Sequence, residues 1–174
     1  MMKNGKPLSF ELLITSPEDE KIALNFKRNL QRLGITMNIR VMDDAAFRGR
    51  LNNYDFDMVS YFWQSSLSPG TEQILYWGCQ AAKEPARWNF PGICDDEIEA
   101  LAGAVANTRD REELVKTMRA LDAKLMAGHY MIPLFYRGSD YIAHKATIKR
   151  PAETPIYGAV VETWWHETPD NSAK

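Results

Sequence analysis

The chain has 174 residues, of which 45% are hydrophobic and 25% are charged, and its formal net charge is −2. These values are ordinary for a globular protein with one domain, or one domain and an appendage. The charge, and the lack of any Lys/Arg cluster, give no reason to expect a nucleic-acid partner. No run of about 18 apolar residues exists, so we expect no direct membrane insertion.

The amino terminus has no apolar h-region and does not read as a signal peptide. Two explanations stay open from composition: a cytoplasmic protein, or a piece of a longer protein whose signal lies upstream.

Strand and helix patterns alternate along the first 62 residues. Three stretches have strand character: 8–14, 35–41 and 56–62. Between the first two, a helix is predicted to begin after its cap Ser16 and to stop at Gly34. A short helix capped by Asp43 or Asp44 follows the second. Right-handed crossovers in this β-α-β-α-β order predict three parallel central strands in a three-layer α/β lobe.

The rest of the chain is mainly helical until its last strand patterns. A short helix is predicted from Thr71, with Ile74, Leu75 and Trp77 as its apolar residues, and residues 78–92 read as irregular. Two longer helices are predicted from Asp95-Asp96 and from Arg109-Asp110. Strands are then predicted at 131–136, where Pro133 implies an edge or a bulge, and at 141–144.

The third strand ends in residues suited to holding a polar organic ligand. Trp63 is followed by the polar run Gln64-Ser65-Ser66, and the run stops at the turn signal Pro69-Gly70. In open α/β sheets, ligands bind beyond the carboxyl ends of the strands. We therefore predict that Trp63, Gln64, Ser65 and Ser66 bind ligand. The alternative is that Trp63 caps the core and the polar run is a solvated loop.

Trp88 and Asn89 are predicted to close this site from the neighbouring irregular loop. Cys79 and Cys94 flank that loop. They are free thiols if the compartment is reducing, and they can close the loop as a disulfide if it is oxidising. The residues alone leave both alternatives open.

No catalytic or cofactor motif is present in the sequence. It contains no P-loop, no G-x-G-x-x-G, no G-x-S-x-G and no H-E-x-x-H. His129, His144 and His166 are far apart and have no ligand spacing, so neither a metal nor a cofactor is expected. The sequence therefore predicts a protein that is not an enzyme.

Five segments, in order, resemble the C-terminal part of the family 5 solute-binding proteins, the oligopeptide and dipeptide receptors of ABC importers. They are Gly5–Ile14, Leu30–Met37, Tyr54–Met58, the pair Asp95–Leu101 with Thr108–Leu114, and Ile132–Tyr136. The loop Phe62–Gly70 and the ending Thr163-Trp164-Trp165 look most similar to the Yej-type peptide receptors.

This resemblance implies a fold, a location and a function. It implies that residues 1–144 are the ligand-binding lobe of a type II periplasmic binding protein and that residues 145–174 are a tail packing on a missing lobe. The receptor is expected in the periplasm, binding peptides or peptide-containing molecules and delivering them to inner-membrane ABC permease subunits. Export implies a Cys79–Cys94 disulfide.

The same resemblance also shows a departure. Where relatives often carry an aspartate that pairs with the peptide's amino terminus, this chain has Ser66. The usual way of recognising the amine is therefore in question. The alternative functions are an interaction domain that binds no ligand and a hydrolase using Ser65 or Ser66.

Overall fold

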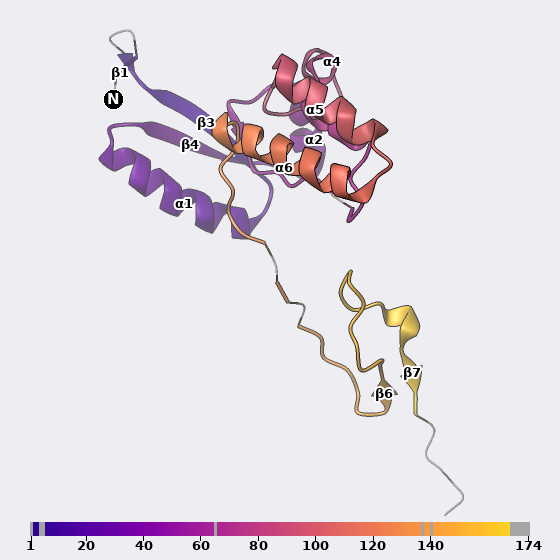
Figure 1. Cartoon of the computed structure of the whole chain (residues 1–174). Coiled ribbons are helices and arrows are strands. Elements are labelled where there is room, and N and C mark those ends of the chain that lie inside the picture. Colours follow the sequence, from indigo (N-terminus) through magenta and orange to yellow (C-terminus); the bar gives the residue numbers. More distant parts are fainter. Residues whose placement is uncertain (1, 4–5, 65, 137, 140, 168–174) are drawn as a thin grey trace, which may run out of the picture. The chain divides into compact units, whose positions relative to one another are not determined.

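Two units make up the computed structural model, Met1–Met131 and Ile132–Lys174. It describes residues 2–3, 6–64, 66–136, 138–139 and 141–167. In chain order, the elements of the first unit (Figure 1) are β1 (Met2–Lys3), β2 (Lys6–Pro7), β3 (Ser9–Ile14), α1 (Pro17–Arg32), β4 (Thr36–Val41), α2 (Asp44–Asn52), β5 (Met58–Val59), α3 (Glu72–Trp77), α4 (Cys79–Lys83), α5 (Asp96–Asn107) and α6 (Arg111–Ala127). The predicted division between lobe and tail, after residue 144, concerns a whole receptor and stays a prediction.

The first unit holds a short antiparallel pair, β1 with β2, and a three-stranded sheet that is parallel, as predicted. The strand order of this sheet is β4-β3-β5, and β3 pairs in parallel with both neighbours. The third strand is much shorter than the expected 56–62, because regular pairing covers only Met58 and Val59. One more bond, from the Ser60 N–H to the Leu13 carbonyl oxygen at 3.2 Å, continues the ladder before the chain leaves the sheet.

Helices cover both faces of this sheet. On one face, Leu12 and Ile14 of β3 form a buried core with Ala23 of α1 and Met37 of β4. Side chains alternate along a strand, so Glu11 and the fully buried Leu13 point to the other face. There the Arg50 guanidinium of α2 lies 2.7 Å from the Glu11 carboxylate. The three-layer α/β architecture is therefore confirmed.

A second core lies among the helices that follow. Its buried residues are Trp77, Ile93, Ile98, Val105, Leu121 and Leu125. The helices predicted from Asp95-Asp96 and Arg109-Asp110 are present, and the Asp95 and Asp110 side chains cap α5 and α6. α4 differs from the sequence-based prediction, in which residues 78–92 are irregular.

The predicted apolar face of α3 is partly wrong. Ile74 and Leu75 are 39% and 37% exposed, whereas Gln73 is buried together with Trp77. The Gln73 side-chain oxygen accepts a hydrogen bond from the Trp77 indole at 3.0 Å, which allows a polar group to enter the core.

The second unit has little regular structure in the residues that are described. β6 (Ile148–Lys149) pairs antiparallel with β7 (Trp165–His166), and a 3₁₀ turn covers Val161–Thr163. The strands predicted at 131–136 and 141–144 are wrong, because neither segment has a strand partner. Strands need a neighbour to satisfy their backbone groups, and apolar alternation alone does not supply one.

No helix in the described ranges is both long and apolar enough to cross a membrane.

Candidate ligand-binding site

The strand-end segment, residues 60–64, leaves the sheet at the carboxyl end of β5. α1 begins at the same, carboxyl-terminal end of the sheet. The Ser60 hydroxyl donates a hydrogen bond to the carboxylate of Asp19, in the first turn of α1, at 3.2 Å. β5 is also an edge strand, since β3 is its neighbour on one side only. The segment therefore lies where ligands bind in sheets of this kind.

Trp63 connects the core to the surface. Its ring centroid lies 5.1 Å from that of Trp77 in the second core and 5.5 Å from that of Tyr61. Its indole Nε1–H donates to the backbone carbonyl oxygen of Trp88 at 2.9 Å. The side chain is half-buried, so it covers the core and still presents a face at the end of the strand.

Gln64 and Ser66, the residues of the polar run that the structure describes, are exposed and form hydrogen bonds with neighbouring groups. The Gln64 carbonyl oxygen accepts a hydrogen bond from the Tyr76 hydroxyl at 2.8 Å. The Ser66 hydroxyl donates to the Ser68 carbonyl oxygen at 2.8 Å and accepts from the Ser68 N–H at 3.1 Å. Ser66 therefore closes a local turn. Ser65 lies outside the described residues.

The loop that carries Trp88 and Asn89 lies beside Trp63, but the two residues differ in accessibility. Trp88 is 44% exposed and meets the Tyr76 ring edge-on at 6.1 Å. Asn89 is fully buried, and its carboxamide is hydrogen-bonded to backbone groups of Gly78 and Ile93. A side chain without accessible surface cannot touch a ligand, so the prediction of direct contact by Asn89 needs correcting to a structural role.

The Cys79–Cys94 disulfide implied by the resemblance is present. Cys79 is the first residue of α4, and Cys94 directly precedes the cap of α5. Their Cα atoms are 4.3 Å apart, so the bridge closes the loop that carries Trp88.

Two titratable groups near the strand-end segment have shifted pKa values. Burial raises the pKa of the Tyr61 phenol, the nearby Tyr76 adds to this, and Arg48 partly opposes it. Tyr61 therefore stays neutral at physiological pH. Burial alone would raise the pKa of Glu72, but hydrogen bonds from the Gly70 N–H and the Gln73 amide outweigh it, and the pKa is lowered. Glu72 is therefore an anion at the end of the polar loop.

Several residues of this site were not predicted from the sequence. Tyr61 lies edge-on to Phe90, with ring centroids 4.5 Å apart, and Phe62 is 75% exposed. Tyr76 joins α3 to the strand-end segment through the hydrogen bond to Gln64. The density of aromatic residues between 54 and 90 was the available signal, but it does not tell which rings meet.

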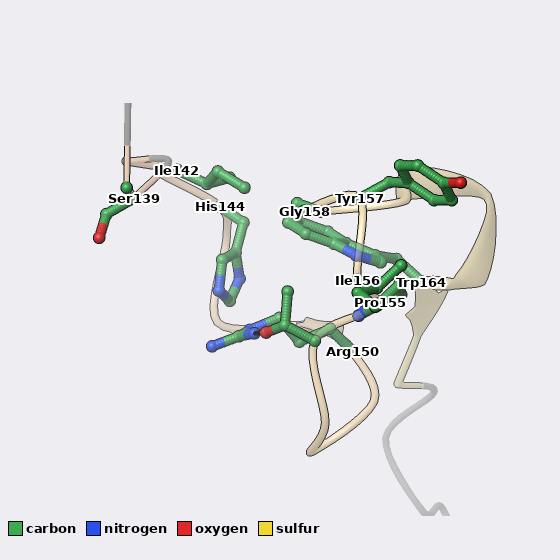
Figure 2. A pocket seen from close by; sticks show the side chains of 12 residues that line it. Ser139, Ile142, His144, Arg150, Pro155, Ile156, Tyr157, Gly158 and Trp164 are labelled. Carbon is green, nitrogen blue, oxygen red and sulfur yellow. Dashed lines mark hydrogen bonds between the residues drawn. The ribbon is translucent and has the colours of Figure 1, made fainter. Parts of the chain in front are cut away.

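A separate hollow of about 660 Å³ lies within the second unit. Figure 2 shows the side chains lining it, among them His144, Arg150 and Trp164. The His144 and Trp164 rings meet edge-on at 5.4 Å. None of the predicted ligand-binding residues lines it.

Within the described part of the chain, no three His, Cys, Asp or Glu residues gather in a group that could hold a metal ion.

Solved structures define the class of fold. The oligopeptide-binding protein AppA of Bacillus subtilis, solved with a nonapeptide, matches 74% of this chain with a TM-score of 0.66 and 22% identity. A periplasmic oligopeptide-binding protein of Thermotoga maritima, solved with mannohexaose, matches 84% with a TM-score of 0.68 and 19% identity. The chain covers 26% and 28% of these two proteins. Its fold is that of part of a periplasmic binding protein.

Sequence relatives narrow the class. A putative binding protein of Brucella suis is 41% identical over 162 residues, which are 93% of this chain and 26% of the relative. Two Agrobacterium fabrum proteins are each 38% identical over 162 residues: the peptidoglycan-binding protein YepA (93% of this chain) and the probable peptide-binding protein YejA (92%), both covered over 26% of their length. No family model matches the chain.

The chain matches the C-terminal part of family 5 solute-binding proteins, and Yej-type proteins are among its relatives. It spans about a quarter of the length of the curated relatives that it matches.

Proposed function

We propose that this chain is the C-terminal part of a longer substrate-binding receptor (the full receptor) of an ABC importer. The full receptor captures peptides or peptide-containing molecules in the periplasm and delivers them to inner-membrane permease subunits. The observation that carries the proposal is the position of Trp63, at the carboxyl end of an edge strand and half-open to solvent. Relatives named as binding proteins support it. The full receptor catalyses no reaction.

The geometry supports binding along the strand end. A peptide that adds beside β5 forms main-chain hydrogen bonds that depend little on its sequence. Trp63 and Trp88 supply an apolar wall, and Phe62 adds exposed aromatic surface. Gln64, Ser65 and Ser66 supply polar groups at the same end. Asn89 acts behind this surface rather than on it.

The domain organisation is part of the proposal. Residues 1–144 form the ligand-binding lobe, and residues 145–174 pack on the remainder of the full receptor. Ile156 and Tyr157 of residues 145–174, which are 81% and 74% exposed here, support contacts of this tail with other parts of the receptor.

The ligand class includes peptidoglycan fragments as well as plain peptides. One relative is named a peptidoglycan-binding protein, and such fragments carry short peptides. Ser66 has no charge to pair with an ammonium group, and its hydroxyl is bonded to Ser68. We therefore propose that the ligand is held by its backbone and by aromatic contacts more than by its amino terminus.

Isothermal calorimetry on the full receptor tests this function. The probes are a defined mixture of alanine peptides of two to six residues and a disaccharide tetrapeptide from peptidoglycan. We expect binding of at least one probe, and Trp63→Ala should raise its Kd by about tenfold or more, the scale of losing a buried aromatic contact. Trp165→Ala, a tryptophan of the second unit, is the control and should bind like the wild type.

Three outcomes contradict the proposal. Wild-type affinity in both Trp63→Ala and Ser66→Ala would place the site elsewhere. Absence of binding to every probe would favour an interaction domain. Cleavage of a probe that Ser65→Ala or Ser66→Ala abolishes, detected by mass spectrometry, would favour a hydrolase.

A further inference from the structure

The disulfide-closed loop, residues 79–94, is held at both ends by one buried side chain. The Asn89 Nδ2 group donates to the carbonyl oxygens of Gly78 at 2.9 Å and Ile93 at 2.8 Å, and Oδ1 accepts from the Ile93 N–H at 2.9 Å. Gly78 precedes the loop, and Ile93 lies at its end. A single amide therefore joins the two ends from inside, beside the covalent bridge between Cys79 and Cys94.

Two more hydrogen bonds join the same loop to the end of α2 and the segment that follows it. The Tyr54 hydroxyl donates to the Ala81 carbonyl oxygen at 2.7 Å. The Ala86 N–H donates to the Asn52 carbonyl oxygen, at the end of α2, at 2.8 Å. Ala86 has a φ of 57°, which is unfavourable for a residue with a Cβ and persists only where the surroundings hold it. The loop is therefore fixed at several points along its length.

The carbonyl oxygen of Trp88, in this fixed loop, accepts a hydrogen bond from the Trp63 indole N–H in the strand-end segment. This hydrogen bond lies in an exposed place, where water competes for both partners. Such a bond orients a ring only if its acceptor is already held in position. Asn89 and the disulfide supply that constraint in two ways. Asn89 follows Trp88 directly, and its side chain anchors this part of the backbone to Gly78 and Ile93. The disulfide joins the two ends of the loop.

We infer that Asn89 and the Cys79–Cys94 disulfide are positioning elements of the ligand site, which hold the Trp88 carbonyl so that it fixes the Trp63 indole. The inference rests on the proposed function for its effect on ligand binding. A pre-positioned indole loses less conformational freedom when a ligand arrives, and affinity rises accordingly. The positioning of the Trp63 indole by these two elements is a property of the protein without ligand.

The test uses the full receptor labelled with 5-fluorotryptophan, with the Trp63 resonance assigned by Trp63→Phe and the Trp164 resonance by Trp164→Phe. The variants are Asn89→Ser and the double variant Cys79→Ser with Cys94→Ser. Asn107→Ser is the matched control, because Asn107 also donates to a backbone carbonyl, that of Gly103 at 2.8 Å, but from an exposed position at the end of α5.

We expect the ¹⁹F resonance of Trp63 to move toward the solvent-exposed value in both test variants, while that of Trp164, which contacts His144 in the second unit, stays in place. The Kd for the best-binding probe of the calorimetry should rise about tenfold, which corresponds to 1.4 kcal/mol. The control should match the wild type in both measurements. If the Asn89 variant does not fold, the disulfide variant decides.

An unchanged Trp63 resonance in a variant with a lower melting temperature would overturn the inference and leave a purely structural role. A shifted resonance with wild-type affinity would overturn the link to binding. If the wild-type receptor binds no probe, the proposed function fails. The Trp63 resonance in the variants still shows whether Asn89 and the disulfide position the indole.

Discussion

The indole nitrogen of Trp63 lies 2.9 Å from the backbone carbonyl oxygen of Trp88, 25 residues further along the chain. Trp63 lies in the strand-end segment that follows β5, and Trp88 belongs to a loop closed by a disulfide. The contact therefore joins the two segments that make up the candidate site. The first two of the predictions that follow concern this contact and the disulfide that closes the loop of Trp88.

Trp63→Phe removes the N–H donor and keeps an aromatic ring. We expect the free energy of unfolding to fall by about 1–2 kcal/mol, from the lost hydrogen bond and the smaller ring. Urea denaturation measures this value. Tyr130→Phe serves as the control, because it also removes a hydrogen-bond donor from an aromatic ring and Tyr130, in the first unit, is 38% exposed; its stability should change little. Equal urea midpoints of unfolding for both variants would argue against a contribution of the Trp63–Trp88 hydrogen bond to stability.

Replacing Cys79 and Cys94 by serine opens a loop of sequence separation 15. In the chain-entropy model, a bridge of this span contributes about 3 kcal/mol by restricting the unfolded chain. The double variant should lose stability of that order in urea, measured without reductant. A reducing agent should lower the free energy of unfolding of the wild type toward that of the variant, and it should not change that of the variant. A wild type insensitive to reductant would contradict this.

Leu13→Ala tests the centre of the sheet. Leu13 has no accessible surface and lies on β3, between both other strands. Loss of a fully buried leucine leaves a cavity and should cost about 2–5 kcal/mol of unfolding free energy. Leu24→Ala, on the exposed side of α1, is the matched control, and it should stay within about 0.5 kcal/mol of the wild type.

Glu72→Gln tests the carboxylate at the end of the polar loop. A lowered pKa means that the folded state favours the charged form, which contributes stability above the ordinary glutamate pKa and loses it as the pH falls through the folded-state value. The variant should be less stable than the wild type at neutral pH. The difference should vanish below the usual titration range of glutamate, as measured by thermal melts between neutral and acid pH. A difference that does not depend on pH would exclude this carboxylate as its source.

The exposed apolar residues of the second unit predict self-association of the 174-residue chain. Val161 is 65% exposed and Trp165 is 52% exposed. Apolar surface of this kind promotes association. Light scattering should show a mass above 19.9 kDa at high concentration, and Val161→Ser with Trp165→Ser should reduce it. A strict monomer would indicate that the tail folds back on the chain's own sheet.

The sequence by itself determined the parts of this protein that depend on local patterns. Alternating apolar residues at 8–14 and 35–41, the cap Ser16 and the aspartates before α5 and α6 each identify an element, because strand pleat and helix caps need only neighbouring residues. Parallel pairing of β3 with β4 and β5 follows from the handedness of the crossovers.

Only the tertiary structure decided which side chains are exposed at the candidate ligand site. Asn89 and Trp88 are adjacent in sequence, yet one is fully buried and the other is 44% exposed. The absence of strands at 131–136 is decided in the same way, since a strand exists only with a partner. Burial and pairing depend on residues distant in the chain, and local pattern carries no information about which of them meet.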